Sequence, residues 1–355
     1  MFKKTKEGVV EKIIKNISMI TLGLLLLSGC GRTKDPSEQS ITLTLGAFTV
    51  PKEVYQKKII PAFTDFWKEK TGQNVRFEQS YEASGAQSRA IRSGFEADIA
   101  ALSLEKDIES IRKAGLITHD WKKNRGKGFI TRSIVIIAHR PGNPKNIKGL
   151  DDLKHRNIEV IYPSPKTSGG AMWVVNTIYG AGLKISEIKT GRQDISFARD
   201  FLKSIQKRVK VMDKSGRMSV TTFENGIGDA LLTYENEALL RQKQGREFPF
   251  IIPDATILIE NPIALVDKNV DRHKNREVAE AFVEFLYTKE SQRSFADYGF
   301  RPVNNDVALE YKDKYPMPKN LFDINYLGGW KNVQKVIYAK EGIWNAVVKE
   351  LSYEN

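Results

Sequence analysis

"IEVIYPSPKTSGGAMWVVNTIYG", residues 158–180, joins a strand-like run to a helix-like run through a short polar turn. The turn ends in Ser168, Gly169 and Gly170, without the lysine of a phosphate-binding loop or the spacing of a dinucleotide-binding motif. Glycine lets another molecule approach the backbone closely, and the first N–H groups of a helix have no intrahelical acceptor. The stretch therefore predicts a strand–turn–helix unit with accessible backbone donors at the helix start.

The rest of the chain repeats this alternation of strand-like and helix-like patterns. Strands are expected at residues 41–48, 74–81, 97–103, 133–140, 158–163, 209–213, 229–235 and 255–266. Helical patterns separate most of them, and the first, 54–70, is expected to be interrupted at Pro61. The alternation predicts an α/β fold with mainly parallel sheets. The long apolar segment 255–268, interrupted by Asn261 and Pro262, is expected to cross between two lobes.

The N-terminal 40 residues have a different character. A basic leader and an apolar run too short to span a membrane comfortably end in "LSGC", residues 27–30. This stretch resembles the bacterial lipobox, which predicts a lipoprotein signal peptide at 1–29 and lipidation of Cys30, with a signal anchor or a free thiol as alternatives. A polar tether, 30–40, follows. Cys30 is the only cysteine, so no internal disulfide can form.

The chain is basic, with a formal net charge of +13, which could indicate nucleic acid or anionic lipid as a partner. Basic and acidic residues alternate on helical segments such as 105–113 and 275–285, and no compact arginine-rich stripe is present. This pattern favours a solvated surface near an anionic membrane and no nucleic-acid partner. Beyond the leader, no run reaches the ~18 apolar residues of a membrane helix. We therefore expect a soluble body held at a membrane surface.

The Ser-Gly arrangement recurs at two other junctions, around Ser84 in "QSYEASGAQSRAI" and around Gly216 in "VMDKSGRMSVTTF". In open α/β sheets, ligands bind beyond the carboxyl ends of strands, where loops lead into helices. Helix N-termini favour negative charge there. Each Ser-Gly alone could be a plain N-cap. Three that converge would form an anion site made of hydrogen-bond donors, without a lysine.

Several longer stretches carry a specific resemblance. They are "YEASGAQSRAIRSGFEADIAALSLEKDIESI", "SPKTSGGAMW", "TTFENGIGDALLTYENEALL", "DYGFRPVN" and "LFDINYLGGW". In this order, between about Ile41 and Gln334, they resemble the bacterial sulfate/thiosulfate-binding proteins of ABC transporters. The resemblance implies a two-lobed α/β receptor of the type 2 periplasmic-binding class, in which a hinged cleft buries the ligand.

The same resemblance implies what the protein does. The ligand would be sulfate or thiosulfate, the partner a membrane permease, and the protein a monomer, lipid-anchored at the extracytoplasmic face of a bacterial cell membrane, without a cofactor. A receptor for another oxyanion, such as phosphate or molybdate, is the alternative within this class.

Four of the sulfate contacts implied by the resemblance fall on matching residues. Ser84, Gly169 and Gly170 would donate backbone N–H groups, and Ser168 would donate its hydroxyl. The resemblance thus assigns to these positions the donor role that the Ser-Gly junctions suggest.

Three further implied contacts depart from the family pattern. Gly216 stands where the family often has alanine, and Thr49 where better-known members have aspartate, but both positions use a backbone N–H. Tyr234 replaces a tryptophan whose indole N–H donates to sulfate. A phenol O–H could donate from a different position, or the ring could only form a wall.

The resemblance also suggests the domain organisation. Lobe 1 is expected to contain residues 41–132 and 258–311, and lobe 2 residues 133–257. The helical stretch 276–299 should pack on lobe 1. The last segment, 312–355, is expected to be helical and is left unassigned.

Signals of catalysis or metal binding are weak. The histidines are scattered without metal-ligand spacing, at His119, His139, His155 and His273. No Ser–His pair or nucleophilic cysteine is evident outside the leader, so an enzyme acting on sulfur or phosphate esters is a poor alternative.

Four charged residues lie near the expected site. Glu235 ends the expected strand 229–235, and Glu237 follows in a stretch that looks helical. The two could resemble a pair of catalytic carboxylates but are interpreted as cap or supporting groups. Lys166 and Arg217 are expected to face solvent, contributing at most to the local field. "GIGD", residues 226–229, is interpreted as a helix stop before a strand.

Overall fold

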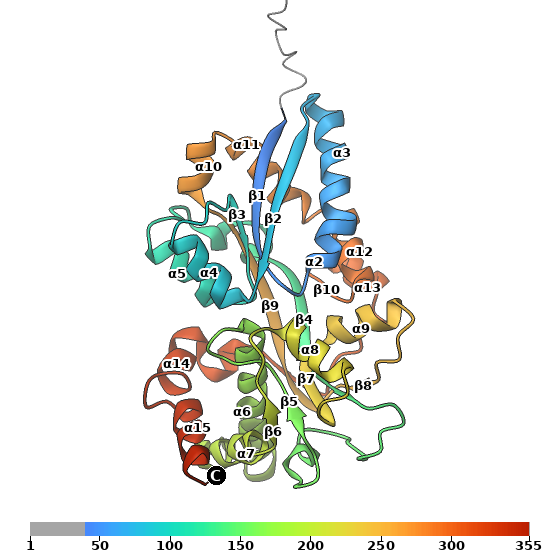
Figure 1. Ribbon diagram of the computed structural model, residues 1–355, viewed down its shortest axis with the longest axis vertical. Coiled ribbons are helices and arrows are strands. Elements are labelled where there is room, and N and C mark those ends of the chain that lie inside the picture. The colour runs from blue at the N-terminus through green and yellow to red at the C-terminus, as the bar shows by residue number, and fades with distance from the viewer. Residues whose placement is uncertain (1–39, 355) are drawn as a thin grey trace, which may run out of the picture.

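The computed structural model describes residues 40–354. The predicted signal peptide, Cys30 and nearly all of the tether lie outside these residues. The described chain forms two lobes, one above the other, joined by two long strands, β4 (Phe129–His139) and β9 (Ala255–Leu265) (Figure 1).

The strands form one sheet in the order β2-β1-β3-β9-β4-β7-β5-β6. Lobe 1 contains β1 (Ile41–Phe48), β2 (Val75–Glu82) and β3 (Ile99–Ala101), and lobe 2 contains β5 (Val160–Ile161), β6 (Val209–Val211) and β7 (Ala230–Tyr234). Three short strands extend the two crossing strands: β8 (Phe250–Ile251) and β10 (Arg301–Pro302) pair with β4, and β11 (Asn320–Phe322) pairs with β9.

The predicted parallel pairing holds within each lobe, where β1 pairs with β2 and β3, and β5 pairs with β6 and β7. The crossing strands instead pair antiparallel with each other and with β3 and β7. The reason is topological: β4 carries the chain into lobe 2 and β9 carries it back.

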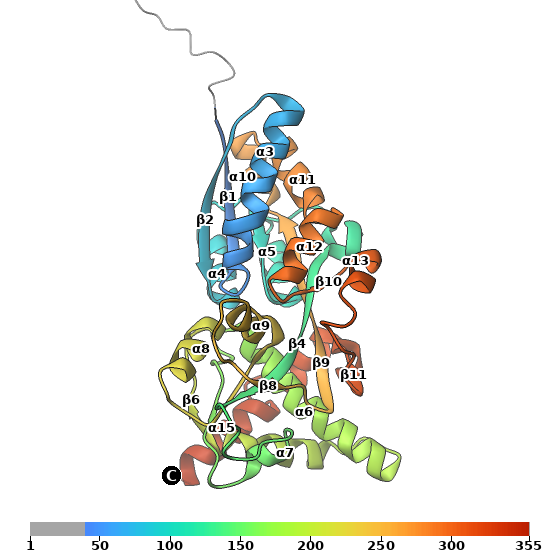
Figure 2. The same ribbon diagram turned by 90° about the vertical axis from the view of Figure 1, so that its right-hand side faces the viewer.

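Lobe 1 is completed by helices on both faces of its strands. They are α2 (Lys52–Val54), η2 (Tyr55–Ile59), α3 (Ile60–Thr71), α4 (Ser84–Arg92), α5 (Glu105–Lys113), η3 (Trp121–Lys123), η4 (Arg125–Gly128), α10 (Asp267–His273), α11 (Arg276–Phe285), α12 (Lys289–Asp297) and α13 (Asn305–Glu310). As predicted, α11 and α12 pack on this lobe, near α3 (Figure 2). The ring centroids of Phe63 and Phe282 lie 5.0 Å apart, and those of Tyr55 and Phe295 lie 5.8 Å apart.

The predicted interruption at Pro61 is wrong, because α2, η2 and α3 run on without a break. The residues before Pro61 form a π-helical turn in which the Ile60 N–H bonds to the Tyr55 carbonyl. Pro61 then falls in the first turn of α3. Proline lacks an N–H donor and its ring crowds the carbonyl four residues earlier, and the wider π-helical turn before Pro61 accommodates both effects without a break in the helix.

Lobe 2 contains the long helix α6 (Gly169–Thr190) and the chain's C-terminal end (Figure 1). Its other helices are η5 (Asp152–Lys154), α7 (Ile195–Gln206), α8 (Gly216–Glu224), α9 (Glu235–Lys243), η6 (Ile324–Leu327), α14 (Gly329–Val336) and α15 (Ile343–Glu354). Trp330 of α14 packs edge-on against Trp173 of α6, with centroids 4.9 Å apart. The C-terminal segment therefore packs on lobe 2, and it includes β11 as well as helices.

The predicted lobe boundaries, 132/133 and 257/258, fall inside β4 and β9 and stay a prediction.

Across residues 40–354, no helix combines the length and apolar character needed to span a bilayer.

Candidate functional site

A pocket lies where the two lobes meet. Its wall is formed by the ends of β1, β2 and β3 in lobe 1 and by the junctions that lead into α6, α8 and α9 in lobe 2. All of the predicted ligand contacts line it: Thr49, Ser84, Ser168, Gly169, Gly170, Gly216 and Tyr234. Among the residues that the structure describes, no charged side chain lines this pocket.

Four helices begin at or beside the pocket. Helix α4 starts at Ser84, α6 at Gly169, α8 at Gly216 and α9 at Glu235, directly after Tyr234. The first N–H groups of each helix have no intrahelical acceptor, and each N-terminus carries about half a positive charge from the helix dipole. The pocket is therefore uncharged in its side chains but favourable to an anion.

Ser168 is the N-cap of α6, a helix whose start was predicted at this Ser-Gly junction. Its Oγ accepts a hydrogen bond from the Ala171 N–H at 3.3 Å, as the Oγ of Ser215 does from Met218 in α8. An accepting hydroxyl keeps its own proton, so the buried Ser168 hydroxyl can still donate to a ligand.

Ser84 is placed differently, because Ala83 is the N-cap and Ser84 is already helical. Its Oγ donates to Asp107 Oδ2 at 2.6 Å and accepts from the Ser103 N–H at 3.1 Å. Burial raises the pKa of Asp107, although Lys106 and Ser84 oppose the shift. The Ser84 side chain is thus engaged within lobe 1, and its backbone N–H is the group it can offer to a ligand.

Tyr234 is buried, and its hydroxyl lies 2.7 Å from Ser103 Oγ. Burial raises the pKa of Tyr234 well above its usual value, so the phenol stays protonated and can donate. Ser103 was not among the residues predicted for this site. The signal was available, since Ser103 ends the predicted strand 97–103 and strand ends line the site.

Lobe-to-lobe contacts surround the pocket. Trp173 of α6 donates its indole N–H to the Ser103 carbonyl at 2.9 Å. A Cβ built on Gly169 would lie 2.7 Å from Ser103 Oγ and 2.9 Å from Leu104 Cγ. The two lobes therefore meet closely at the start of α6.

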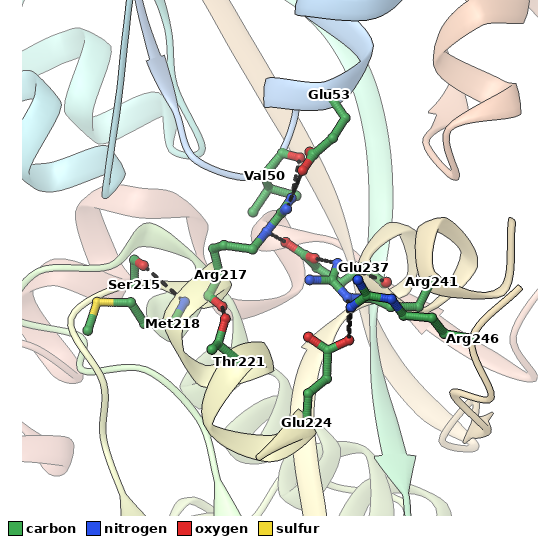
Figure 3. A network of polar contacts seen from close by, with 10 residues as sticks. All are labelled: Val50, Glu53, Ser215, Arg217, Met218, Thr221, Glu224, Glu237, Arg241 and Arg246. Carbon is green, nitrogen blue, oxygen red and sulfur yellow. Dashed lines mark hydrogen bonds and ion pairs between the residues drawn. The ribbon is translucent and has the colours of Figure 1, made fainter. Parts of the chain in front are cut away.

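Arg217 bridges the lobes beside the pocket (Figure 3). It binds both carboxylate oxygens of Glu53 from α2, one at 2.9 Å, and its Nε donates to Glu237 Oε1 at 3.2 Å. Glu237 also pairs with Arg241. The expectation that Arg217 faces solvent is wrong, because the first turn of α8 faces α2 and the side chain, a quarter exposed, crosses between them.

The other charged residues near the site have separate roles. Glu235, in the first turn of α9, forms a buried two-pronged ion pair with Arg301, at 2.7 and 2.8 Å. Lys166 is exposed, as expected, and lines a neighbouring groove with Arg89, Arg92 and Lys106. Residues 226–229 connect the end of α8 to β7.

Three of the four histidines lie within hydrogen-bond distance of a carboxylate or a backbone carbonyl. His119 lies 2.7 Å from Asp267, and His273 lies 2.7 Å from Asp98. His139 contacts the Arg140 carbonyl, and His155 is exposed. Within 40–354, no group of three His, Cys, Asp or Glu is arranged to hold a metal ion.

A family model described as bacterial extracellular solute-binding protein matches residues 55–301, and the chain belongs to this family. The chain is 39% identical to the sulfate-binding protein of Synechocystis sp. over 90% of both chains. It is 35% identical to that of Escherichia coli over 88% of this chain and 94% of the relative. It is also 30% identical to the thiosulfate-binding protein of Pseudomonas aeruginosa over 95% and 98%.

Solved structures of solute-binding proteins are also similar to this chain. The sulfate-binding protein SubI from Mycobacterium tuberculosis H37Rv aligns with a TM-score of 0.75 and 36% identity, over 84% of this chain and 99% of that one. A periplasmic thiamin-binding protein, 14% identical with a TM-score of 0.62 over 88% and 97%, shares the fold. The predicted family resemblance and the two-lobed α/β fold are confirmed.

Proposed function

We propose that the protein is an extracytoplasmic receptor that captures sulfate or thiosulfate for import by an ABC transporter. The observation that carries this proposal is the uncharged pocket at which four helices begin. Sulfate and thiosulfate carry no proton at neutral pH and present only acceptor atoms, which suits a wall of N–H and O–H donors. The sulfate- and thiosulfate-binding relatives support the same ligands.

The proposed mechanism is capture, closure and delivery. The anion would enter between separated lobes, the lobes would close by bending at β4 and β9, and a permease would release it. The proposed contacts are Thr49, Ser84, Gly169, Gly170 and Gly216 through backbone N–H groups, and Ser168 and Tyr234 through hydroxyls. They come from both lobes, so closure completes the site.

The cellular setting is also part of the proposal. We propose that Cys30 carries a lipid anchor and that the monomeric receptor works at the extracytoplasmic face of the cell membrane. Relatives in the family are extracellular solute-binding proteins, which supports this location. The parent should incorporate a radiolabelled fatty acid, and Cys30→Ser should abolish this labelling. Equal labelling of the two proteins would contradict a lipid anchor on Cys30.

Isothermal titration calorimetry with a panel of oxyanions tests the proposed ligand. Sulfate or thiosulfate should bind, and phosphate should bind less tightly by ~1–3 kcal/mol or more. At neutral pH phosphate carries a proton that needs an acceptor, and no carboxylate lines the described pocket. Phosphate or molybdate that outcompeted both sulfur anions would favour the alternative oxyanion receptor. Turnover of a sulfate ester would favour an enzyme, although the relatives are solute-binding proteins.

Ser168→Ala and Lys166→Ala separate hydrogen-bond donors from surface charge. Loss of the Ser168 hydroxyl should cost ~1.5–3 kcal/mol of sulfate affinity, the range for a hydrogen bond to a charged group. Lys166 is exposed, so its removal should cost less than ~0.5 kcal/mol in physiological salt. Titrations of both variants with sulfate measure the difference. A larger loss in the Lys166 variant would point to a salt-bridged anion.

A further inference from the structure

Several contacts from lobe 2 converge on Ser103 of lobe 1. Its Oγ lies 2.7 Å from the Tyr234 hydroxyl, its carbonyl accepts from Trp173, and Gly169 approaches its side chain. Ser103 is 1% exposed and Tyr234 is 3% exposed, and both line the pocket. The hydroxyl pair forms between lobes, so closure brings it together.

The pair has two protons and uses only one of them. If Tyr234 donates to Ser103, the serine proton is free, and if Ser103 donates, the phenol proton is free. Each arrangement leaves one O–H beside the start of α6. Backbone N–H donors have fixed directions, whereas this donor can be presented from either of two oxygens.

We propose that Ser103 is a further ligand-binding residue, which shares with Tyr234 the task of donating one hydrogen bond to the anion. This inference rests on the proposed function and deepens it. The donor belongs to the pair, so removal of either hydroxyl leaves the other with an unshared O–H that can rotate towards the ligand. Removal of both leaves no hydroxyl donor at this place.

The test is a double-mutant cycle with sulfate, read by calorimetric titration of the full chain. Ser103→Ala and Tyr234→Phe should each raise Kd by less than about threefold, because the remaining hydroxyl substitutes. The double variant should raise Kd roughly 10- to 150-fold, the equivalent of one charge-assisted hydrogen bond. The combined loss should thus exceed the product of the single losses.

Matched controls remove hydroxyls outside the pocket. Ser204, which donates to the Asp200 carbonyl, and Tyr326, which donates to Glu187, lie in lobe 2 away from the site. Ser204→Ala with Tyr326→Phe should bind sulfate like the parent. Ser103→Ala keeps the carbonyl that accepts from Trp173, so thermal unfolding without sulfate should change little.

Other outcomes would overturn the inference in distinct ways. A Tyr234→Phe variant as weak as the double variant would make the phenol the only donor. An equally weak Ser103→Ala variant would make the serine the only donor. If the losses in sulfate binding free energy were additive, the two hydroxyls would make independent contacts with the anion. If all three variants bound sulfate like the parent, the pair would line the pocket without donating to the anion. A parent protein that bound neither sulfate nor thiosulfate would overturn the proposed function itself, and this inference with it.

Discussion

Gly169→Ala is expected to weaken sulfate binding by ~3 kcal/mol or more, which is over a hundredfold in Kd. The added Cβ would lie 2.7 Å from Ser103 Oγ and 2.9 Å from Leu104 Cγ, and both atoms belong to the opposite lobe. Closure would have to stop short or displace the start of α6. The N–H groups that begin this helix would then miss the anion.

The same substitution should leave the separated lobes intact. Gly169 is the first helical residue, where the advantage of alanine over glycine is smaller than the ~1 kcal/mol of a helix interior, so the thermal midpoint without sulfate should stay the same or rise slightly. Calorimetry gives the affinity, and small-angle X-ray scattering with excess sulfate shows whether the lobes close. Binding within threefold of the parent, with normal compaction, would contradict the close approach.

Gly216→Ala is the matched control for Gly169→Ala. Gly216 also begins a helix at the pocket and keeps its N–H on substitution. Its Cβ would meet only Val50 Cγ2, at 3.9 Å. Sulfate should therefore bind this variant almost as tightly as the parent. Comparison of the two variants therefore separates the effect of a steric clash between the lobes from the effect of replacing a glycine at a helix start.

Local patterns were enough to predict many of the residues that line the pocket. Ser168 and Gly216 stand where a strand-like run gives way to a helix-like run, and short-range periodicity is enough to locate such a junction. In open α/β sheets, ligands bind beyond the carboxyl ends of the strands. This rule predicts that junctions far apart in the sequence line the same site, without any knowledge of contacts. Tyr234 lies near the end of the predicted strand 229–235, which indicated its place at the site. Its role as a donor was predicted only from the family resemblance.

What could not be predicted depends on contacts between distant segments. Arg217 and Glu53 are 164 residues apart, and nothing in either neighbourhood indicates that α8 faces α2. The Ser103–Tyr234 pair likewise exists only because two lobes meet. The π-helical turn before Pro61 was missed for a different reason: proline predicts a local disturbance, but not the geometry that absorbs it.

Arg217→Ala is expected to speed sulfate release, with a loss of ~2–4 kcal/mol in affinity, roughly 30- to 1,000-fold in Kd. Its guanidinium is the cation that joins Glu53 of lobe 1 to Glu237 of lobe 2 (Figure 3). Burial alone would lower the pKa of Arg217, but the two carboxylates outweigh it and raise the pKa. In the open state the lobes are apart and Glu53 is solvated with or without Arg217. In the closed state truncation leaves Glu53 without its partner, so the variant should destabilise the closed state more than the open one.

Release of radiolabelled sulfate into excess unlabelled sulfate measures this effect. Arg246→Ala is the matched control, because it removes the same charge from a pair with Glu224 that lies within lobe 2 and is exposed. Its release rate should match that of the parent. If Arg217→Ala released sulfate no faster than Arg246→Ala, the bridge would contribute nothing to closure.

The pH dependence of release gives a second measurement of the same bridge. Burial tends to raise the pKa of Glu53, but Arg217 outweighs it, and the pKa lies below the usual 4.5. A carboxyl whose pKa is lowered by its partner contributes stability above its usual pKa and loses it as the pH falls through the lowered value. Sulfate release by the parent should therefore be constant between pH 5 and 8 and accelerate below ~4.5. In Arg217→Ala, release should already be fast at pH 7, and the acid-dependent acceleration should be smaller. An equal acceleration in both proteins would place the acid-sensitive group elsewhere.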